Sequence, residues 1–188
     1  RGRTMKIFSN FDTNRKQEAY QEAIEKFWKE SVLVLNKSLL FFFSKVVFPL
    51  LWWTVVFVLL QFPIYFSLGE FWVAKYLVTI LLFFIYLFML SPIFKYYLDY
   101  MMDFSLVTPE FLTRYNQSWM LKRDIKSSYV KNIKTITIEK NTLRYNIFDN
   151  GNLIFLSEWD RDNDGEIVLH YIQNPEQAKK KIVRIMKL

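Results

Sequence analysis

The sequence predicts an α+β membrane protein, in which a two-helix transmembrane hairpin is followed by a seven-stranded antiparallel β-barrel capped by a C-terminal helix. Three observations predict this class. Two long charge-free segments lie in the first half of the chain. The apolar residues then change from helical to alternating spacing, and the last residues carry helix-start signals. Since 52% of the 188 residues are apolar, 19% aromatic and still 23% charged, the apolar side chains must be concentrated in particular segments.

The charge-free segments are residues 46–68 and 76–94, with 23 and 19 residues. As helices they would be about 34 and 28 Å long, against a hydrocarbon layer of about 30 Å. A buried hairpin of a soluble helical protein is the alternative, but its helices would need a polar face, which these segments lack. We therefore expect a transmembrane hairpin over residues 46–94. A cleaved signal peptide is not expected, because the first segment begins far from the start of the chain.

Basic residues around the hairpin predict its orientation. The seven residues 69–75 make the two helices antiparallel neighbours, so both ends of the chain share one side. Lys75 is the basic residue of this connection. The flanks on the other side carry six basic residues, namely Lys26, Lys29, Lys37, Lys45, Lys95 and Arg114. Basic residues favour the cytoplasmic side, so we expect a multi-pass protein of the inner cell membrane with both termini in the cytoplasm.

Residues 1–45 are predicted as an N-terminal amphipathic juxtamembrane helix. Helical spacing begins at Asn14 and relates Tyr20, Ile24, Phe27, Trp28, Ser31 and Leu35. Such a helix either lies in the lipid headgroup layer or packs on the cytoplasmic domain, and the sequence favours neither alternative. Residues 32–43 would extend the first membrane helix towards the cytoplasm.

Residues 95–188 are predicted as a cytoplasmic β-domain. Apolar and alternating segments indicate strands at 104–107, 111–116, 119–126, 133–138, 143–149, 152–157 and 166–172. Alternation places Ile133 on one face with Thr135 and Thr137. Asn150-Gly151 predicts a hairpin turn, because both residues tolerate positive φ. Asn174 as N-cap and Pro175 at the first helical position predict a final helix that buries Ala178, Ile182, Ile185 and Met186.

Several short motifs carry a resemblance to a known family. They are Ser105-Leu106-Val107-Thr108-Pro109-Glu110-Phe111-Leu112-Thr113, Ile125 with residues 129–138, Glu166-Ile167-Val168-Leu169, and Asn174-Pro175-Glu176. With them, roughly residues 76–186 resemble the bacterial PH-domain (pleckstrin-homology-like) membrane proteins, in which a transmembrane hairpin precedes a barrel of seven strands and one helix. The chain departs from the family at Glu139-Lys140-Asn141-Thr142, where a glycine-bearing turn is common. The resemblance implies a PH-like fold and a membrane location, but no reaction.

The sequence offers little for catalysis or metal binding. The absence of cysteine excludes disulfides and thiolate sites, and the single His170 cannot build a multi-histidine metal centre. The spacing of the four glycines excludes dinucleotide and phosphate loops. Asp160, Asp162 and Asp164 match the first half of a calcium loop, but its closing ligand position is Tyr171. We therefore expect a solvated turn there, no metal, no cofactor and no enzymatic activity.

Charge is distributed unevenly over the predicted domain. Residues 114–144 hold eight basic and two acidic residues, whereas residues 145–176 hold one and seven. Either this is chance clustering on a solvated surface, or a basic face meets anionic inner-leaflet lipids or an acidic partner. The candidate membrane- or partner-facing residues are Arg114, Lys122, Arg123, Lys126 and Lys131. No base-stacking motif accompanies them, so nucleic acid is not expected.

These observations predict a membrane-anchored PH-like scaffold or interaction module. A lipid- or ion-responsive membrane regulator, using the basic face or the acidic loop, is the alternative. A permease accessory subunit is a third and weaker option, because no ionisable residue lies near the middle of either apolar segment. The expected partners are the lipid bilayer, an unidentified protein and a second copy of the chain.

Overall fold

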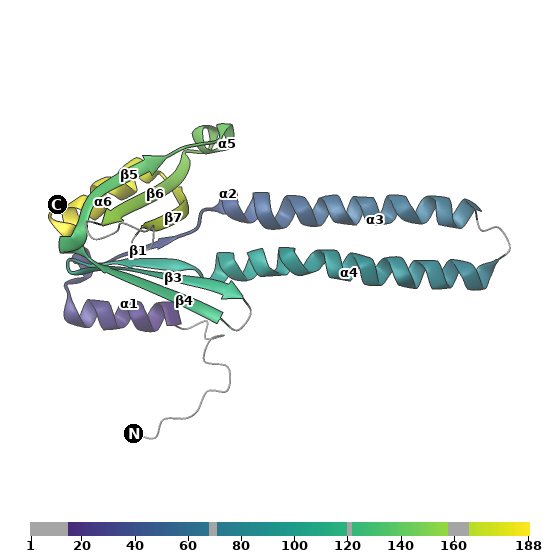
Figure 1. Cartoon of the computed structure of the whole chain (residues 1–188), viewed down its shortest axis with the longest axis horizontal. Helices are drawn as coiled ribbons and strands as arrows, with labels where there is room; N and C mark the ends of the chain where they lie inside the picture. Colours follow the sequence, from purple (N-terminus) through teal and green to yellow (C-terminus); the bar gives the residue numbers. More distant parts are fainter. Residues whose placement is uncertain (1–14, 68–70, 120–121, 158–165) are drawn as a thin grey trace, which may run out of the picture. The chain divides into compact units, whose positions relative to one another are not determined.

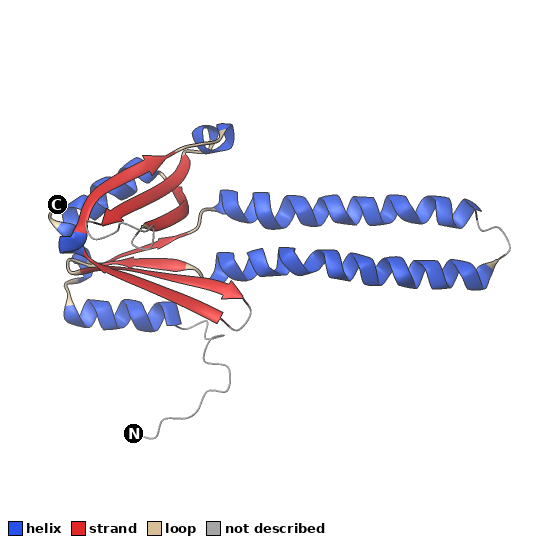
Figure 2. Ribbon diagram, viewed as in Figure 1, coloured by secondary structure: helices blue, strands red, loops and turns tan. Residues whose placement is uncertain are grey.

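The computed structural model describes residues 15–67, 71–119, 122–157 and 166–188 (Figures 1 and 2). The chain divides into two compact units. The helical unit is Phe41–Tyr97, and the α/β unit combines Arg1–Leu40 with Leu98–Leu188. The helical unit is thus inserted into the α/β unit along the sequence. The sequence-based division at residues 45/46 and 94/95 did not anticipate that the segment before the hairpin belongs with the segment after it.

Two long apolar helices form the insertion, as the sequence predicts. The first runs through α2 (Leu39–Phe42), a π-helical turn (Phe43–Val47) and α3 (Phe48–Ser67), and the second is α4 (Trp72–Met102). The apolar stretches Leu39–Phe66 and Trp72–Met102, of 28 and 31 residues, are long and apolar enough to cross a membrane. The helix begins at Leu39, so residues 32–38 do not extend it as predicted.

Polar side chains within the helical unit pair with each other. The Thr79 hydroxyl donates to Gln61 Oε1 at 3.3 Å, and the hydroxyls of Thr54 and Tyr86 lie 3.0 Å apart. The two members of each pair are equally distant in sequence from position 70. This symmetry is expected of two antiparallel helices joined by a short connection, because both rise by the same distance per residue.

Seven strands build two antiparallel sheets in the α/β unit. The first sheet has the order β1-β2-β3-β4, with β1 (Leu33–Asn36), β2 (Phe104–Val107), β3 (Phe111–Trp119) and β4 (Lys122–Tyr129). The second has the order β5-β6-β7, with β5 (Ile133–Glu139), β6 (Asn150–Ser157) and β7 (Ile167–Gln173). The described strands do not close into a barrel, so the predicted closed barrel is wrong in this respect.

The strand β1 is the element that the sequence did not predict. It pairs with β2 in the register Leu33↔Val107 and Asn36↔Phe104. These partners are again equally distant from position 70, so the strand ladder keeps the symmetry of the helices. The pairing satisfies one edge of β2, and it makes residues on both sides of the inserted hairpin part of one sheet.

The segment 143–149 is not a strand. Residues 143–147 form the short helix α5 (Leu143–Ile147), whose N-cap Thr142 accepts a hydrogen bond from Tyr145 N at 3.3 Å. Asn150 and Gly151 begin β6 instead of forming a hairpin turn. A Cβ at Gly151 would lie 3.1 Å from both the Glu139 carbonyl oxygen and Pro175 Cγ. Close packing therefore favours glycine at this position, and the predicted Asn-Gly turn is wrong.

Two β-bulges change which residues face the core. The register of β5 with β6 shifts between Ile133 and Thr135, so Ile133 and Ile136 are both buried, while Thr135 and Thr137 are exposed. The expected sharing of a face by Ile133, Thr135 and Thr137 is therefore wrong. The register of β6 with β7 shifts between Gly151 and Leu153, where one extra β7 residue is accommodated.

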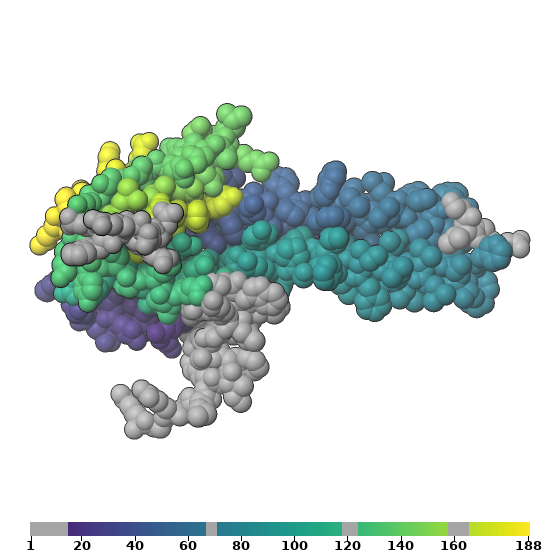
Figure 3. All heavy atoms as spheres, viewed as in Figure 1, coloured from purple at the N-terminus to yellow at the C-terminus, as the bar shows by residue number. Residues whose placement is uncertain are grey.

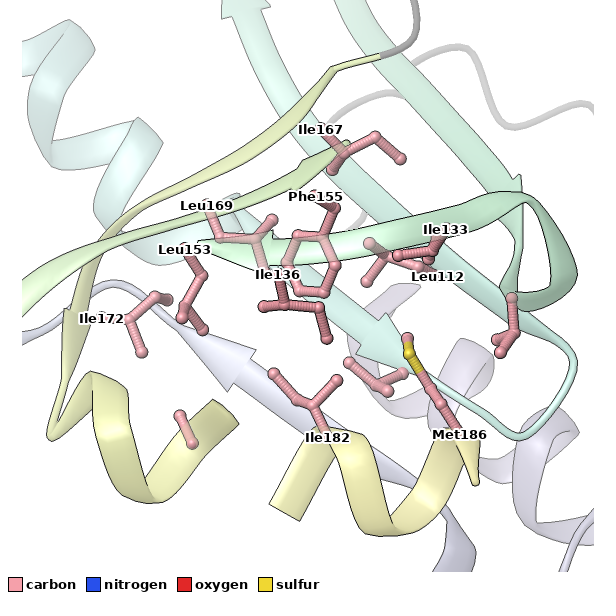
Figure 4. Packing of buried hydrophobic residues seen from close by; sticks show 13 residues of the cluster. Leu112, Ile133, Ile136, Leu153, Phe155, Ile167, Leu169, Ile172, Ile182 and Met186 are labelled. Carbon is pink, nitrogen blue, oxygen red and sulfur yellow. The ribbon is translucent and has the colours of Figure 1, made fainter. Parts of the chain in front are cut away.

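The core lies between the two sheets and the C-terminal helix α6 (Pro175–Met186). Leu112 of the first sheet, Leu153 and Phe155 of the second and Ile182 of α6 are almost completely buried together (Figure 4). The helix buries Ala178, Ile182 and Met186 as predicted, with Ile185 partly buried. Asn174 occupies the N-cap position, but its side chain makes no capping bond, and its φ is 47°.

The helix α1 (Arg15–Lys26) covers the opposite face of the four-stranded sheet. Ala23 is buried there with Leu106, and Tyr20, Ile24 and Phe27 pack around them. Figure 3 shows the purple residues of this helix directly against the green strands of the unit. Of the two alternatives left open by the sequence, packing on the folded domain is therefore correct. Trp28, which the helical spacing included, is exposed.

Candidate functional site

A small open pocket lies where β1 ends and β2 begins. It has about 290 Å³ of empty space, including its mouth, and its polar lining comes from Lys37, Asp103, Ser105, Arg114 and His170. Lys37 directly follows β1, and Asp103 directly precedes β2. Arg114 lies opposite Ser105 in the β2–β3 ladder, while β7 of the other sheet contributes His170. Four strands or strand ends therefore each contribute one charged or titratable residue to the pocket.

A buried ion pair joins two residues of this pocket, Lys37 and Asp103. Lys37 Nζ donates to Asp103 Oδ2 at 2.6 Å, with side chains 14% and 7% exposed. The other oxygen, Asp103 Oδ1, accepts a hydrogen bond from Gln117 N at 2.6 Å. Charges of this kind are tolerated away from water only when they are paired and hydrogen-bonded. Asp103 thus connects the start of β2 to β1 and β3.

Arg114 adds a positive charge to the pocket, and His170 adds a titratable group. Burial lowers the pKa of Arg114, and the nearby charge of Asp103 opposes that shift. Burial also lowers the pKa of His170, and the positive charges of Arg114 and Lys37 lower it further, against the opposing effect of Glu139. The imidazole is therefore neutral at pH 7, where Lys37 and Arg114 face one carboxylate, Asp103, among the polar residues that line the pocket. This excess of one positive charge suits an anion.

The described geometry does not support a serine nucleophile in this pocket. Ser105 and His170 line the same pocket, but within the described part of the chain no hydrogen bond joins the hydroxyl to the imidazole. The Arg114 guanidinium donates to Asn116 Oδ1 at 3.3 Å. What the arrangement can do chemically is to bind an anion and to respond to its charge through His170.

The predicted basic residues are only partly brought together. Arg114 lies in the pocket, and Lys126 of β4 is its direct cross-strand partner and is exposed. Lys131 lies in the 3₁₀ turn Val130–Asn132, with its Nζ 5.3 Å from the ring centroid of Tyr129. Lys122 and Arg123 begin β4, but their side chains lie outside the described part of the structure.

The acidic loop lies outside the described residues. Asp160, Asp162 and Asp164 fall within 158–165, so the expectation of a solvated turn stays a prediction. Among the residues that the structure does describe, no group of three His, Asp or Glu side chains is placed to hold a metal ion.

Comparison with known proteins finds no family model, no curated protein and no solved structure that matches this chain. The class is therefore defined by the structure itself. It is an α+β protein with two long apolar helices and with two antiparallel sheets of four and three strands.

Sequence reasoning missed Lys37 and Asp103. A usable signal existed, because the two residues are equally distant from position 70 and both lie just outside the apolar helices. An antiparallel hairpin brings such residues opposite each other. His170 gave no comparable signal, because its position depends on the bulge in β7.

Proposed function

We propose that the chain is an integral membrane protein whose two apolar helices cross the bilayer, and that its α/β unit is a cytoplasmic PH-like scaffold or interaction module without enzymatic activity. The observation that carries the proposal is the environment of the apolar helices. Only 6% of the most apolar window of each helix is buried within the protein. The lengths of 28 and 31 residues correspond to about 42 and 46 Å, and a bilayer with its headgroups is about 40–45 Å thick.

The number of described strands and the final helix of the α/β unit are compatible with the PH-like proposal. Seven strands and a C-terminal helix that closes the core are the elements that the resemblance implies. The difference is that the first strand precedes the membrane hairpin. Two residues separate β1 from α2, and one separates α4 from β2. Connections this short would hold the unit beside the bilayer at two neighbouring strands, which suits a platform for partners.

Reporter fusions test the membrane placement. A reporter that is active only in the cytoplasm is fused after Leu188 or inserted within residues 69–75. We expect activity from the first fusion and none from the second, with the protein retained in membranes after an alkaline wash. Activity from the insertion alone would reverse the orientation, and release by the wash would contradict membrane spanning.

Crosslinking in native membranes tests the interaction module. We expect one stoichiometric adduct, either with a second copy of the chain or with one other protein, formed from a photoreactive residue at Lys126. The same residue at Lys180 on α6 provides a matched exposed control on another surface. Monomer alone at both positions would contradict this part of the proposal.

The pocket favours a second candidate, the lipid- or ion-responsive regulator. Arg114 and Lys126 lie directly opposite each other, and like charges in such a pair destabilise a sheet. A bound anion would relieve this repulsion and raise the pKa of His170. Because His170 is the one histidine of the sequence, its NMR signal can be titrated without overlap in a chain free of a histidine tag. We expect inorganic phosphate to raise its pKa, and Arg114→Gln to abolish the rise; no change would contradict the candidate.

The basic face is tested against lipid in the same preparation. A fragment that starts at Asp103 would lack β1, so the full chain in nanodiscs is required. We expect replacement of Lys122, Arg123, Lys126 and Lys131 by Gln to reduce hydrogen-exchange protection of β4 on anionic nanodiscs. Replacement of Lys179, Lys180 and Lys181 on α6 is the control. A larger effect of the control would show that the basic face does not contact the membrane.

A further inference from the structure

The short helix α5 exposes three large apolar side chains on one small element. Leu143, Ile147 and Phe148 are 80%, 74% and 58% exposed. Single exposed apolar residues are ordinary on protein surfaces, but adjacent ones on one short loop form a patch that water solvates poorly. Arg144 lies between them in the sequence and is also exposed. An exposed apolar group with a cation beside it is the composition of an interfacial membrane contact.

This helix is fixed to the α/β unit. The Thr142 side chain caps it, and Tyr145 is buried with its ring in T-shaped contact with Tyr171, at 5.3 Å between centroids. Burial raises the pKa of Tyr145, as does a hydrogen bond with Tyr171. Lys140 Nζ donates to Asp149 Oδ1 at 2.8 Å and so closes the base of the loop. Tyr145 thus holds the helix, while the three apolar side chains remain outside.

Tyr171, the ring partner of Tyr145, also contacts the residue at which the chain leaves the α/β unit. The Tyr171 carbonyl oxygen accepts a hydrogen bond from Ser38 N at 2.8 Å, and Ser38 is the residue before α2. Ser38, Tyr145 and Tyr171 all belong to the α/β unit. Figure 1 accordingly shows β1 and β5 ending at the same end of this unit, where α5 lies. The apolar patch is therefore next to the exit of the first apolar helix.

The length of that helix sets the depth of the exit. Because Leu39–Phe66 is about as long as the bilayer with its headgroups is thick, Ser38 falls at the boundary between headgroups and water. The helix α5 is joined to Tyr171 by a ring contact, and Tyr171 is hydrogen-bonded to Ser38, so α5 lies close to the residue that precedes the first apolar helix. Its exposed apolar side chains can then enter the layer between headgroups and hydrocarbon.

We propose that α5 is a third membrane contact, in which Leu143, Ile147 and Phe148 insert into the headgroup region of the bilayer that holds the two apolar helices, while Arg144 binds lipid phosphate. The inference rests on the proposed membrane placement. It adds α5 to the two chain connections as a third point at which the α/β unit meets the bilayer.

Single-cysteine labelling tests the proposal, because the sequence contains no cysteine. Nitroxide labels are placed at Ile147→Cys and Phe148→Cys of the full chain, in nanodiscs of phosphatidylcholine and phosphatidylglycerol. Phe88→Cys in α4 and Lys180→Cys on the exposed side of α6, away from the basic face, are the references for lipid and water. We expect labels at 147 and 148 to be more accessible to oxygen than to a water-soluble nickel complex, at a depth between the two references.

The two reference labels distinguish a failure of the proposed membrane placement from a failure of the α5 contact alone. A label at 88 that is as accessible to nickel as the label at 180 would overturn the proposed membrane placement. A lipid depth at 88 together with water exposure at 147 and 148 would overturn only the α5 contact. Shielding of 147 and 148 from both oxygen and nickel would show that protein covers the patch, and would also overturn it.

A label at the exposed Asn146 provides an independent measurement. With the native neighbours, we expect several-fold lower nickel accessibility at 146 than at 180. Replacing Leu143, Ile147 and Phe148 by Ser should bring the two accessibilities together, while hydrogen-exchange protection of the Tyr145 amide reports that α5 remains folded. Unchanged accessibility with α5 intact would contradict the role of the apolar side chains.

Discussion

The helical unit and the α/β unit place residues of the same type in opposite environments. Phe88 of α4 is 74% exposed, whereas Phe155 of β6 is 1% exposed. The difference lies in the pattern around each residue. Residues 76–94 are apolar on every side of the helix, while the strands alternate and bury one face. The number of apolar residues alone therefore does not decide burial within the chain, because their spacing decides whether one face or the whole surface of an element is apolar.

The two units also satisfy polar groups differently. In the helical unit neutral side chains pair with each other, as Thr79 does with Gln61. In the α/β unit the buried Asp103 is held by a lysine and a backbone amide. Neutral pairs are compatible with a lipid environment, whereas a buried charge requires the dense donors of a folded core.

The largest expected effect distinguishes the two environments of phenylalanine. Phe155→Ala should lower the free energy of unfolding of the α/β unit by about 3–5 kcal/mol, because it leaves a cavity in the core. Phe88→Ala should leave that unit unchanged. Hydrogen exchange of the detergent-solubilised chain, read over β6, measures both. Equal effects would contradict the independence of the two units.

The second prediction compares two ion pairs of similar length. Asp103→Asn should lower the free energy of unfolding by about 3 kcal/mol, because it leaves Lys37 buried without its charged partner. Glu110→Gln removes the ion pair with Lys26. Lys26 Nζ and Glu110 Oε2 are also close, at 2.7 Å, but the two side chains are 57% and 50% exposed. Exposed pairs contribute about 0–1 kcal/mol, so this variant is the control in the same denaturation experiment. A similar loss in free energy of unfolding for both variants would show that burial does not determine the contribution of these ion pairs.

A smaller effect is expected at the cap of α5. Thr142→Ala should reduce the stability of this helix by about 1 kcal/mol, because the Tyr145 amide loses its side-chain acceptor. Hydrogen exchange of that amide should accelerate accordingly. Thr137→Ala on the exposed face of β5 is the control, and equal acceleration there would point to a general loss of stability.

The smallest predicted effect concerns pH. The pKa of His170 is lowered in the folded state by burial and by Arg114 and Lys37, so the unfolded chain takes up its proton first as the pH falls. The stability of the α/β unit should therefore decline as the pH drops below about 6.5, and level off below the folded pKa. His170→Gln should remove this decline. A rise in stability over the same interval would contradict the assigned sign.

Much of the fold can be predicted from local pattern. Charge-free length predicted both apolar helices, and proline with acidic first-turn chemistry predicted α6. Alternation predicted most strands. It failed at Thr135 and Thr137, because the bulge in β5 shifts the face of every later residue and leaves no local signature. It failed at residues 143–149, where the Thr142 cap and the contact of Tyr145 with Tyr171 favour a helix.

The sequence by itself determined the two apolar helices, their antiparallel relation and the helix that closes the core, because these depend on composition and spacing within one segment. Only the tertiary structure decided that Leu33–Asn36 is a strand of the β-sheet, and that Lys37, Asp103, Arg114 and His170 share a pocket. These groupings join residues far apart in the chain. A four-residue strand has no stability alone, and becomes a strand only when β2 provides its hydrogen-bonding partners.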